Sequence, residues 1–131
     1  MRVHMITACL TAACSFAFPA LAQDTVNLVG TWKGPRERVH VTQPTYSDTA
    51  TIVITEQKGM TFRGEAKWTS PTGEHSEPFV GAFPISGKIG AGSSKDGQIV
   101  YELINPTTLN SCYTETGSEF LTSCSHLTKQ P

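Results

Sequence analysis

The stretch MTFRGEAKWT, residues 60–69, alternates apolar or small side chains with polar ones along its whole length. Side chains of a strand point alternately to its two faces. The apolar face here consists of Met60, Phe62, Gly64, Ala66 and Trp68. One apolar face and one solvated face are typical of an antiparallel strand that lies on a core. The stretch therefore predicts such a strand, with Phe62 and Trp68 buried.

Seven more runs show the same period-two pattern, and turn residues separate them. They are residues 28–33, 37–42, 50–56, 79–85, 98–104, 109–115 and 119–127. Three intervening segments are rich in turn residues and predict loops, at residues 43–48, 70–76 and 86–97. Beyond the first 22 residues the chain has no convincing helical pattern and no internal repeat.

This pattern predicts an all-β fold, a small antiparallel up-and-down β-barrel of about eight strands. Short connections make neighbours in sequence neighbours in the sheet. A meander of eight strands closes into a barrel because closure removes both exposed edges. The alternative is a β-sandwich, which usually needs longer crossing connections.

The first 22 residues predict a cleaved signal peptide. Arg2 supplies a short positive region, residues 6–18 are mostly apolar, and Ala20 and Ala22 are the small residues that a signal peptidase requires. Cleavage after Ala22 leaves residues 23–131 as a single domain, exported to the periplasm or secreted.

The four cysteines divide into two pairs. Cys9 and Cys14 lie in the predicted signal, and a lipid anchor on either is the alternative to a cleaved leader. Cys112 and Cys124 remain, and in an exported chain they predict a disulfide. With residues 117–119 at the turn centre, the two cysteines fall opposite each other in the last hairpin.

The charge of the chain argues against two classes of partner. Ten Lys and Arg residues face eleven Asp and Glu residues, so the formal net charge is −1. No basic run points to nucleic acid, and no cationic amphipathic helix points to membrane insertion.

No motif for catalysis or metal binding stands out. His40, His75 and His126 are isolated from other metal-ligating residues, and we expect them at the surface or the rim. Alternation directs Glu65 and Glu102 outward, so a shared acidic site is not expected. We therefore expect no enzyme activity, no cofactor and no metal.

The triplet Gly30-Thr31-Trp32 resembles the opening of lipocalins and, especially, of avidin-type proteins. The resemblance implies an eight-stranded barrel with Trp32 packed across its closed end. It also implies a small ligand held inside the barrel.

The chain departs from the avidin pattern at the positions that hold biotin. Gly34 and Arg38 stand where that family has Asn and Ser, and Ala66 and Trp68 stand where it has Tyr and Ser. Unpaired polar atoms in a dry pocket cost about 1–3 kcal/mol each. Biotin binding is therefore not expected.

The last two runs suggest which side chains face the interior. If the cysteines share the outer face, Ser111, Tyr113, Ser123 and Ser125 face inward. The candidate ligand-binding residues are therefore the aromatic Trp68, Tyr101 and Tyr113 and the hydroxyl-bearing Ser111, Ser123 and Ser125. No Lys or Arg is clearly directed inward, which predicts an uncharged or singly charged, partly apolar ligand.

Two alternatives stay open. A barrel of eight strands is wide enough either to be filled by side chains or to hold one small ligand. A pocket of roughly a few hundred Å³ favours the ligand. A filled interior favours a protein-binding barrel, such as an exported hydrolase inhibitor or envelope adaptor, with contacts from the three predicted loops.

Overall fold

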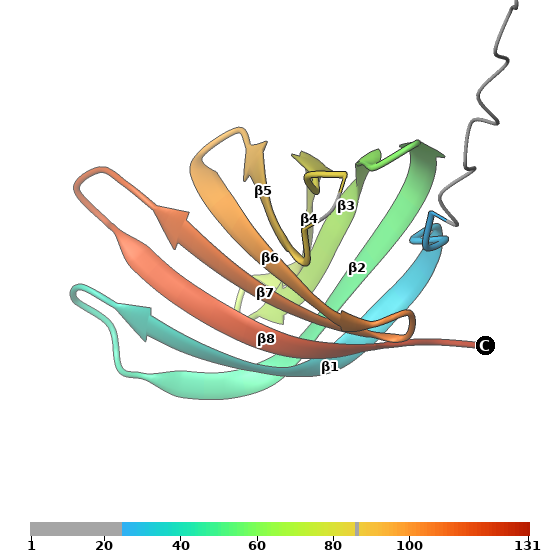
Figure 1. Ribbon diagram of the computed structural model, residues 1–131. Helices are drawn as coiled ribbons and strands as arrows, with labels where there is room; N and C mark the ends of the chain where they lie inside the picture. Colours follow the sequence, from blue (N-terminus) through green and yellow to red (C-terminus); the bar gives the residue numbers. More distant parts are fainter. Residues whose placement is uncertain (1–24, 86) are drawn as a thin grey trace, which may run out of the picture.

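The computed structural model describes residues 25–131 except residue 86, so the predicted signal peptide lies outside the described residues. Eight strands make up the fold (Figure 1). They are β1 (Gly30–His40), β2 (Tyr46–Lys58), β3 (Thr61–Ser70), β4 (Gly73–Ala82), β5 (Ile89–Ser94), β6 (Gly97–Asn105), β7 (Thr108–Glu115) and β8 (Leu121–Lys129).

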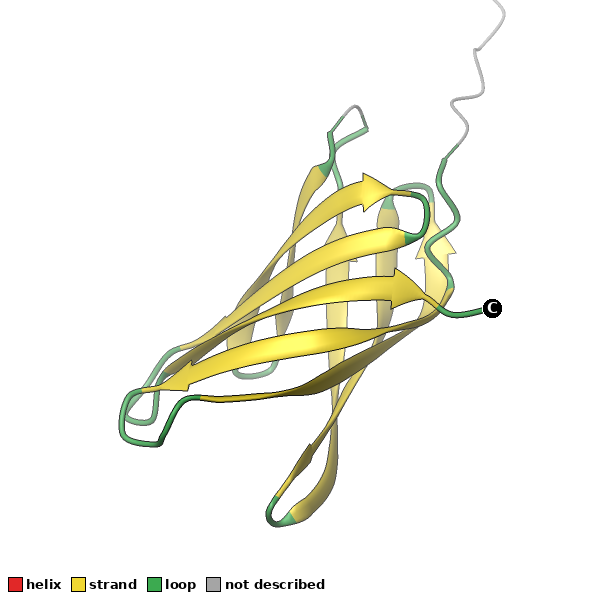
Figure 2. Cartoon of the chain, turned by 90° about the horizontal axis from the view of Figure 1, so that it is seen from below, coloured by secondary structure: helices red, strands yellow, loops and turns green. Residues whose placement is uncertain are grey.

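Each strand pairs in antiparallel fashion with the next, and β1 pairs with β8 to close a barrel. Figures 1 and 2 show this wall of tilted strands from two directions. The described residues contain no helix, and so none that is long and apolar enough to cross a membrane. The predicted up-and-down barrel is confirmed, and the β-sandwich alternative is wrong.

The runs predicted at 28–33 and 37–42 form a single strand, β1, with Gly34 and Pro35 inside it. A Cβ atom on Gly34 would lie 1.9 Å from the carbonyl oxygen of His126, so glycine allows the backbone of β8 to approach this closely. Pro35 lacks an N–H, and it lies where the β1–β8 register skips two residues while pairing with β2 continues.

The segment 86–97 is not the loop that its glycines predict, because it contains strand β5. Those glycines serve the packing of the interior. A Cβ atom on Gly92 would lie 2.8 Å from the ring of Tyr101, so the small residue makes room for the aromatic one. The predicted number of strands is right because this additional strand offsets the two runs that merge.

The remaining predicted loops are also shorter than expected. The loop at 70–76 reduces to a two-residue turn, since β3 ends at Ser70 and β4 begins at Gly73. The loop at 43–48 ends early, since β2 begins at Tyr46.

The β1–β2, β3–β4, β5–β6 and β7–β8 connections lie at one end of the barrel, called here the open end. The C-terminus lies at the opposite, closed end (Figure 1).

Large apolar side chains fill the closed end. Leu28, Trp32, Leu109 and Leu127 have no exposed surface. The Trp32 indole donates from Nε1 to the carbonyl oxygen of Leu28 at 2.8 Å, and the Leu28 amide donates to Oε1 of Gln57 at 2.7 Å. The chain before β1 therefore covers this end, with Trp32 packed across it.

An aromatic cluster continues the core toward the middle of the barrel. The ring centroid of Phe62 lies 5.3 Å from that of Tyr101, 5.8 Å from that of Phe83 and 6.3 Å from that of Phe79. All four side chains are buried, which confirms the predicted burial of Phe62. Edge-to-face and offset contacts of this kind add to the free energy gained by burial.

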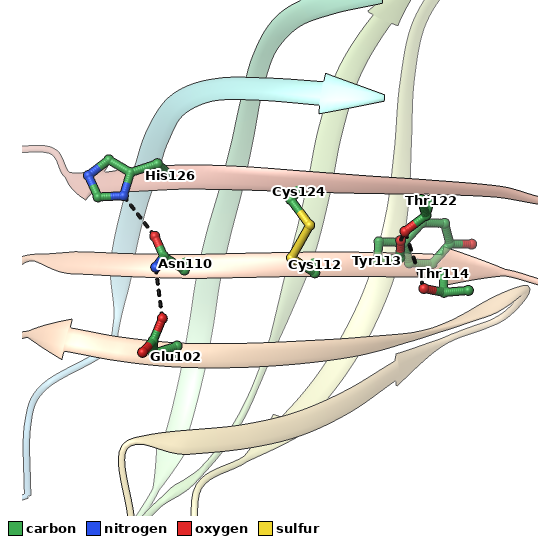
Figure 3. The surroundings of a disulfide bond; sticks show 8 residues. All are labelled: Glu102, Asn110, Cys112, Tyr113, Thr114, Thr122, Cys124 and His126. Atoms are coloured by element: carbon green, nitrogen blue, oxygen red, sulfur yellow. Dashed lines mark hydrogen bonds between the residues drawn. A yellow bond between two sulfur atoms is a disulfide. The ribbon is translucent and has the colours of Figure 1, made fainter. Parts of the chain in front are cut away.

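The disulfide joins two directly opposite residues of the last hairpin. Cys112 on β7 and Cys124 on β8 are register partners and are bonded, as predicted. A hydrogen-bonded row of Glu102, Asn110 and His126 lies beside them (Figure 3). Glu102 and His126 are exposed, so the bridge braces the barrel wall from the outer side.

Candidate functional site

Toward the open end the side chains no longer fill the interior, and a cavity of about 140 Å³ remains. Its apolar lining comes from several strands and consists mainly of Ala50, Ile52, Ala66, Phe79, Ile99 and Leu121. Its polar lining comes from inward positions nearer the rim. The barrel therefore has, at the end opposite Trp32, a cavity that is lined by both apolar and polar side chains.

All six residues predicted to bind a ligand border this cavity. Three are aromatic and three carry hydroxyls: Trp68, Tyr101, Tyr113, Ser111, Ser123 and Ser125. They come from β3, β6, β7 and β8. Those on β7 and β8 face away from the disulfide, because side chains alternate along each strand. The structure thus brings the predicted set together around one cavity.

The predicted burial of Trp68 is wrong. The residue is only partly buried, near the end of β3, where no further layer of side chains covers the interior. Its ring stacks on His75 of β4, with the centroids 5.6 Å apart and an angle of 20° between the planes. Trp68 and His75 therefore form one side of the cavity's rim.

The two tyrosines occupy different depths. Tyr101 is 1% exposed, and burial raises the pKa of its phenol well above the ordinary value. Burial also raises the pKa of Tyr113, the nearby Ser94 hydroxyl opposes that shift, and the carboxylates of Glu77, Glu115 and Asp96 reinforce it. Both phenols are neutral at physiological pH and can serve as hydrogen-bonding groups.

Arg36 and Arg38 line the cavity, which contradicts the prediction that no Lys or Arg is directed inward. Arg36 is held by Asp48 of the neighbouring strand: its Nε donates to Oδ1 at 2.7 Å and its Nη2 to Oδ2 at 2.5 Å. These two parallel hydrogen bonds pair the guanidinium with the carboxylate at a site where each side chain is mostly buried. The charge of Arg36 is therefore neutralised within the protein.

Arg38 has no such carboxylate partner among the described residues. Its Nη1 donates to the hydroxyl of Tyr46 at 2.7 Å, and its guanidinium lies 5.5 Å from the centre of the Tyr46 ring. The Nε atom is buried and has no hydrogen-bond partner. Arg38 thus presents a positive charge and an unused donor to the cavity.

Two more lining residues have buried polar atoms without a partner. These are Oε1 of Glu77 and Oγ of Ser94. The Ser94 hydroxyl lies near enough to the Tyr113 phenol to lower its pKa, but Oγ of Ser94 has no hydrogen-bond partner. In the described part of the chain, the only buried side-chain atoms without partners are these two and Nε of Arg38.

Sequence reasoning missed Arg36, Arg38, Glu77 and Ser94. A signal for the arginines exists, because they are separated from Trp32 by even numbers of residues and so share its face in a continuous strand. Splitting β1 into two runs concealed that relation. Ser94 was assigned to a loop, since its strand is rich in glycine.

The histidines are not all at the surface. His126 is exposed and His75 is partly buried, but His40 is 8% exposed at the rim. Its Nδ1 accepts from the amides of Thr42 and Gln43 at 3.2 and 3.3 Å, so the ring fixes the chain that leaves β1. In the range 25–131, without residue 86, no three His, Cys, Asp or Glu side chains gather as a metal site requires.

Comparisons with known proteins show the fold only. No protein-family model matches the chain, and none of the curated proteins matches its sequence. Among solved structures the chain is similar to a redesigned β-barrel, with a TM-score of 0.55 and 15% sequence identity. The match covers 79% of this chain and 92% of that one. At this identity, the likeness supports an eight-stranded barrel architecture and no particular activity.

Proposed function

We propose that this protein is an exported binding protein that holds a small, partly apolar ligand in the cavity at the open end. The observation that supports this most strongly is the position of the unpaired polar atoms of Arg38, Glu77 and Ser94. Buried polar groups are nearly always hydrogen-bonded, and each unpaired one costs about 1–3 kcal/mol. All three border the same cavity, where a ligand can supply the missing partners.

The cavity sets the size of the ligand. Its volume of about 140 Å³ is smaller than the few hundred Å³ typical of pockets for larger ligands. An engineered apolar cavity of about 150 Å³ in another protein binds benzene. The ligand is therefore a single ring or a short chain, or the inserted end of a longer molecule.

The lining fits such a ligand. Trp68, Tyr113 and Phe79 offer flat apolar surfaces, and Ser111 and Ser123 offer hydroxyls between them. A few polar groups in a mainly apolar wall are typical of small-molecule sites. The lipocalin-like and avidin-like triplet Gly30-Thr31-Trp32 is in keeping with this proposal, since barrels of those groups hold ligands inside.

A thermal-shift screen tests the proposal. The exported protein is heated with single-ring and short-chain compounds in neutral, acidic, basic and zwitterionic forms. A ligand that binds only the folded state raises the melting temperature with increasing concentration. We expect such a shift for wild type and for Ala91→Phe, which adds a ring to the outer face. Ala66→Phe, which fills the cavity, is expected to abolish it.

Tyr113→Ala is a better probe of binding than Tyr101→Ala, because Tyr101 belongs to the aromatic core and its loss affects folding. The proposal is contradicted if none of the compounds gives a concentration-dependent shift. So does a shift that survives in Ala66→Phe, because the compound then binds elsewhere.

The protein-binding alternative rests on a different surface. Val39, Val41 and Phe120 are 53%, 44% and 52% exposed, and the Val41 amide donates to the carbonyl oxygen of Phe120 at 3.1 Å. This apolar group lies beside the rim, between the β1–β2 and β7–β8 connections. If no small compound stabilises the protein, and a stoichiometric complex with a hydrolase is lost in Val41→Asp and Phe120→Asp, the inhibitor function replaces the carrier function.

A further inference from the structure

One wall of the cavity is positively charged. Of the two arginines on β1, only Arg36 is paired, through its fork with Asp48. Arg38 forms no ion pair within the described residues, and its contact with Tyr46 leaves its charge intact. The free donor at this wall is Nε of Arg38, and its natural partner is an anionic or carbonyl oxygen.

A second wall is negatively charged. Glu77 on β4 forms no ion pair in the described part of the chain, and its Oε1 is buried without a donor. The unpaired hydroxyl of Ser94 on β5 also belongs to this part of the cavity lining. A carboxylate only accepts hydrogen bonds, so Glu77 requires an N–H or O–H group, and a cationic amine satisfies its charge as well.

The two walls lie apart in the barrel. Going round the sheet, β2 and β3 separate β1 from β4 on one side, and β5 to β8 separate them on the other (Figure 1). Arg38 and Glu77 do not approach within 4.0 Å of each other as an ion pair, although both border the cavity. No salt bridge therefore neutralises the two opposite charges that border this cavity.

We propose that the ligand is amphoteric, with an anionic oxygen that meets Arg38 and an amino group that meets Glu77, joined by a ring or a short apolar chain. This inference rests on the proposed function and specifies the class of ligand. A ligand with a single charge leaves either Arg38 or Glu77 without an oppositely charged partner. A neutral ligand leaves both unpaired, and buried charges without partners are costly.

Aromatic side chains of the lining accommodate the apolar part of the ligand. Tyr113 and Trp68 border the cavity together with Arg38 and Glu77. Carboxylates near Tyr113 help to raise the pKa of its phenol. The phenol therefore stays neutral, and Glu115, which also lines the cavity and acts on Tyr113, adds to the negative charge on the side of Glu77.

Four matched probes test the proposal by calorimetry: 4-(aminomethyl)benzoate, 4-methylbenzoate, 4-methylbenzylamine and p-xylene. They share a para-substituted ring and differ in carrying both charges, the negative one, the positive one or neither. We expect 4-(aminomethyl)benzoate to bind at least about tenfold more tightly than either singly charged probe, since a charge-assisted hydrogen bond contributes at least that factor.

Two variants assign the charges to their residues. Arg38→Met is expected to remove the advantage of the zwitterion over 4-methylbenzylamine, and Glu77→Gln its advantage over 4-methylbenzoate. Glu56→Gln, which removes an exposed carboxylate that pairs with Arg63 away from the cavity, is the matched control and should leave the order unchanged. Circular dichroism and melting of each variant establish that it is folded before its affinities are compared.

The outcomes separate the inference from the proposed function. If the four probes bind with similar affinity, or if a neutral or singly charged probe binds best, the ligand class is wrong while the binding function stands. If neither these probes nor any compound of the thermal-shift screen binds, the proposed function itself fails. A zwitterion preference that persists in both Arg38→Met and Glu77→Gln also contradicts the assignment.

Discussion

The two ends of the barrel are built from the same eight strands but are stabilised differently. At the closed end, Leu28, Trp32, Leu109 and Leu127 are wholly buried, and the polar groups of Trp32 and Leu28 are hydrogen-bonded within the protein. At the open end, serines, tyrosines and charged residues border a cavity. A barrel of this size thus need not be uniformly filled, because burial at one end can stabilise the fold while the other retains unpaired polar groups.

The largest expected effect is at the closed end. Trp32→Ala should lower the free energy of unfolding by about 3–5 kcal/mol, because it removes a fully buried indole and leaves a void. Trp68→Ala should lower it by much less, since that ring is partly exposed at the rim. Urea unfolding of both variants measures the difference. Equal losses would remove the distinction between the two ends.

The disulfide is expected to matter next. Cys112 and Cys124 are 12 residues apart and brace the wall of the open end. Opening a loop of this size should cost about 3 kcal/mol in the chain-entropy account. The double variant Cys112→Ala/Cys124→Ala, unfolded in urea beside the oxidised wild type, measures this. A double variant as stable as wild type would show that packing alone holds the open end.

A smaller loss is expected from Asp48→Asn. The change leaves Arg36 mostly buried without its carboxylate, which should cost about 1–3 kcal/mol. Glu56→Gln is the matched control, since Glu56 pairs with Arg63 on the exposed outer face and such pairs contribute about 0–1 kcal/mol. If chemical denaturation gives the same loss for both variants, the interior ion pair has no special role.

The smallest expected effect appears at alkaline pH. Burial raises the pKa of Tyr101 in the folded protein, whereas the unfolded phenol ionises near pH 10. Above that pH the unfolded state binds fewer protons, so stability is lost as the pH rises. Unfolding midpoints from pH 8 to 11 should fall less steeply in Tyr101→Phe than in wild type. Parallel slopes would mean that Tyr101 is not buried as described.

Much of the fold could be predicted because alternation in strands is a local signal. The stretch around Phe62, the inward serines of the last hairpin and the pairing of Cys112 with Cys124 all follow from counting in steps of two. The same counting predicted that Tyr113 and Ser123 face the interior, where they border the cavity. A buried face imposes this period strongly, since a slip of one residue reverses every side chain.

The rest depends on contacts between strands that are distant in sequence. In the sequence, Gly34 indicates a turn and Gly92 indicates a loop. In the structure, Gly34 lies against the backbone of β8 and Gly92 lies against the ring of Tyr101. These misreadings concealed β5 and the inward direction of Arg38. The inward arginines of β1 were therefore hidden by a glycine whose role is set by tertiary packing.

Amide chemical-shift mapping of the isotopically labelled protein, residues 23–131, tests the central claim most directly. The claim is that the open end holds a ligand site while the closed end is a filled core. During titration with 4-(aminomethyl)benzoate, we predict saturable shifts at Ser111, Tyr113 and Ser123 and almost none at Leu28 and Leu127. Shifts that do not saturate, or that concentrate at the closed end or on the outer face, would contradict the account.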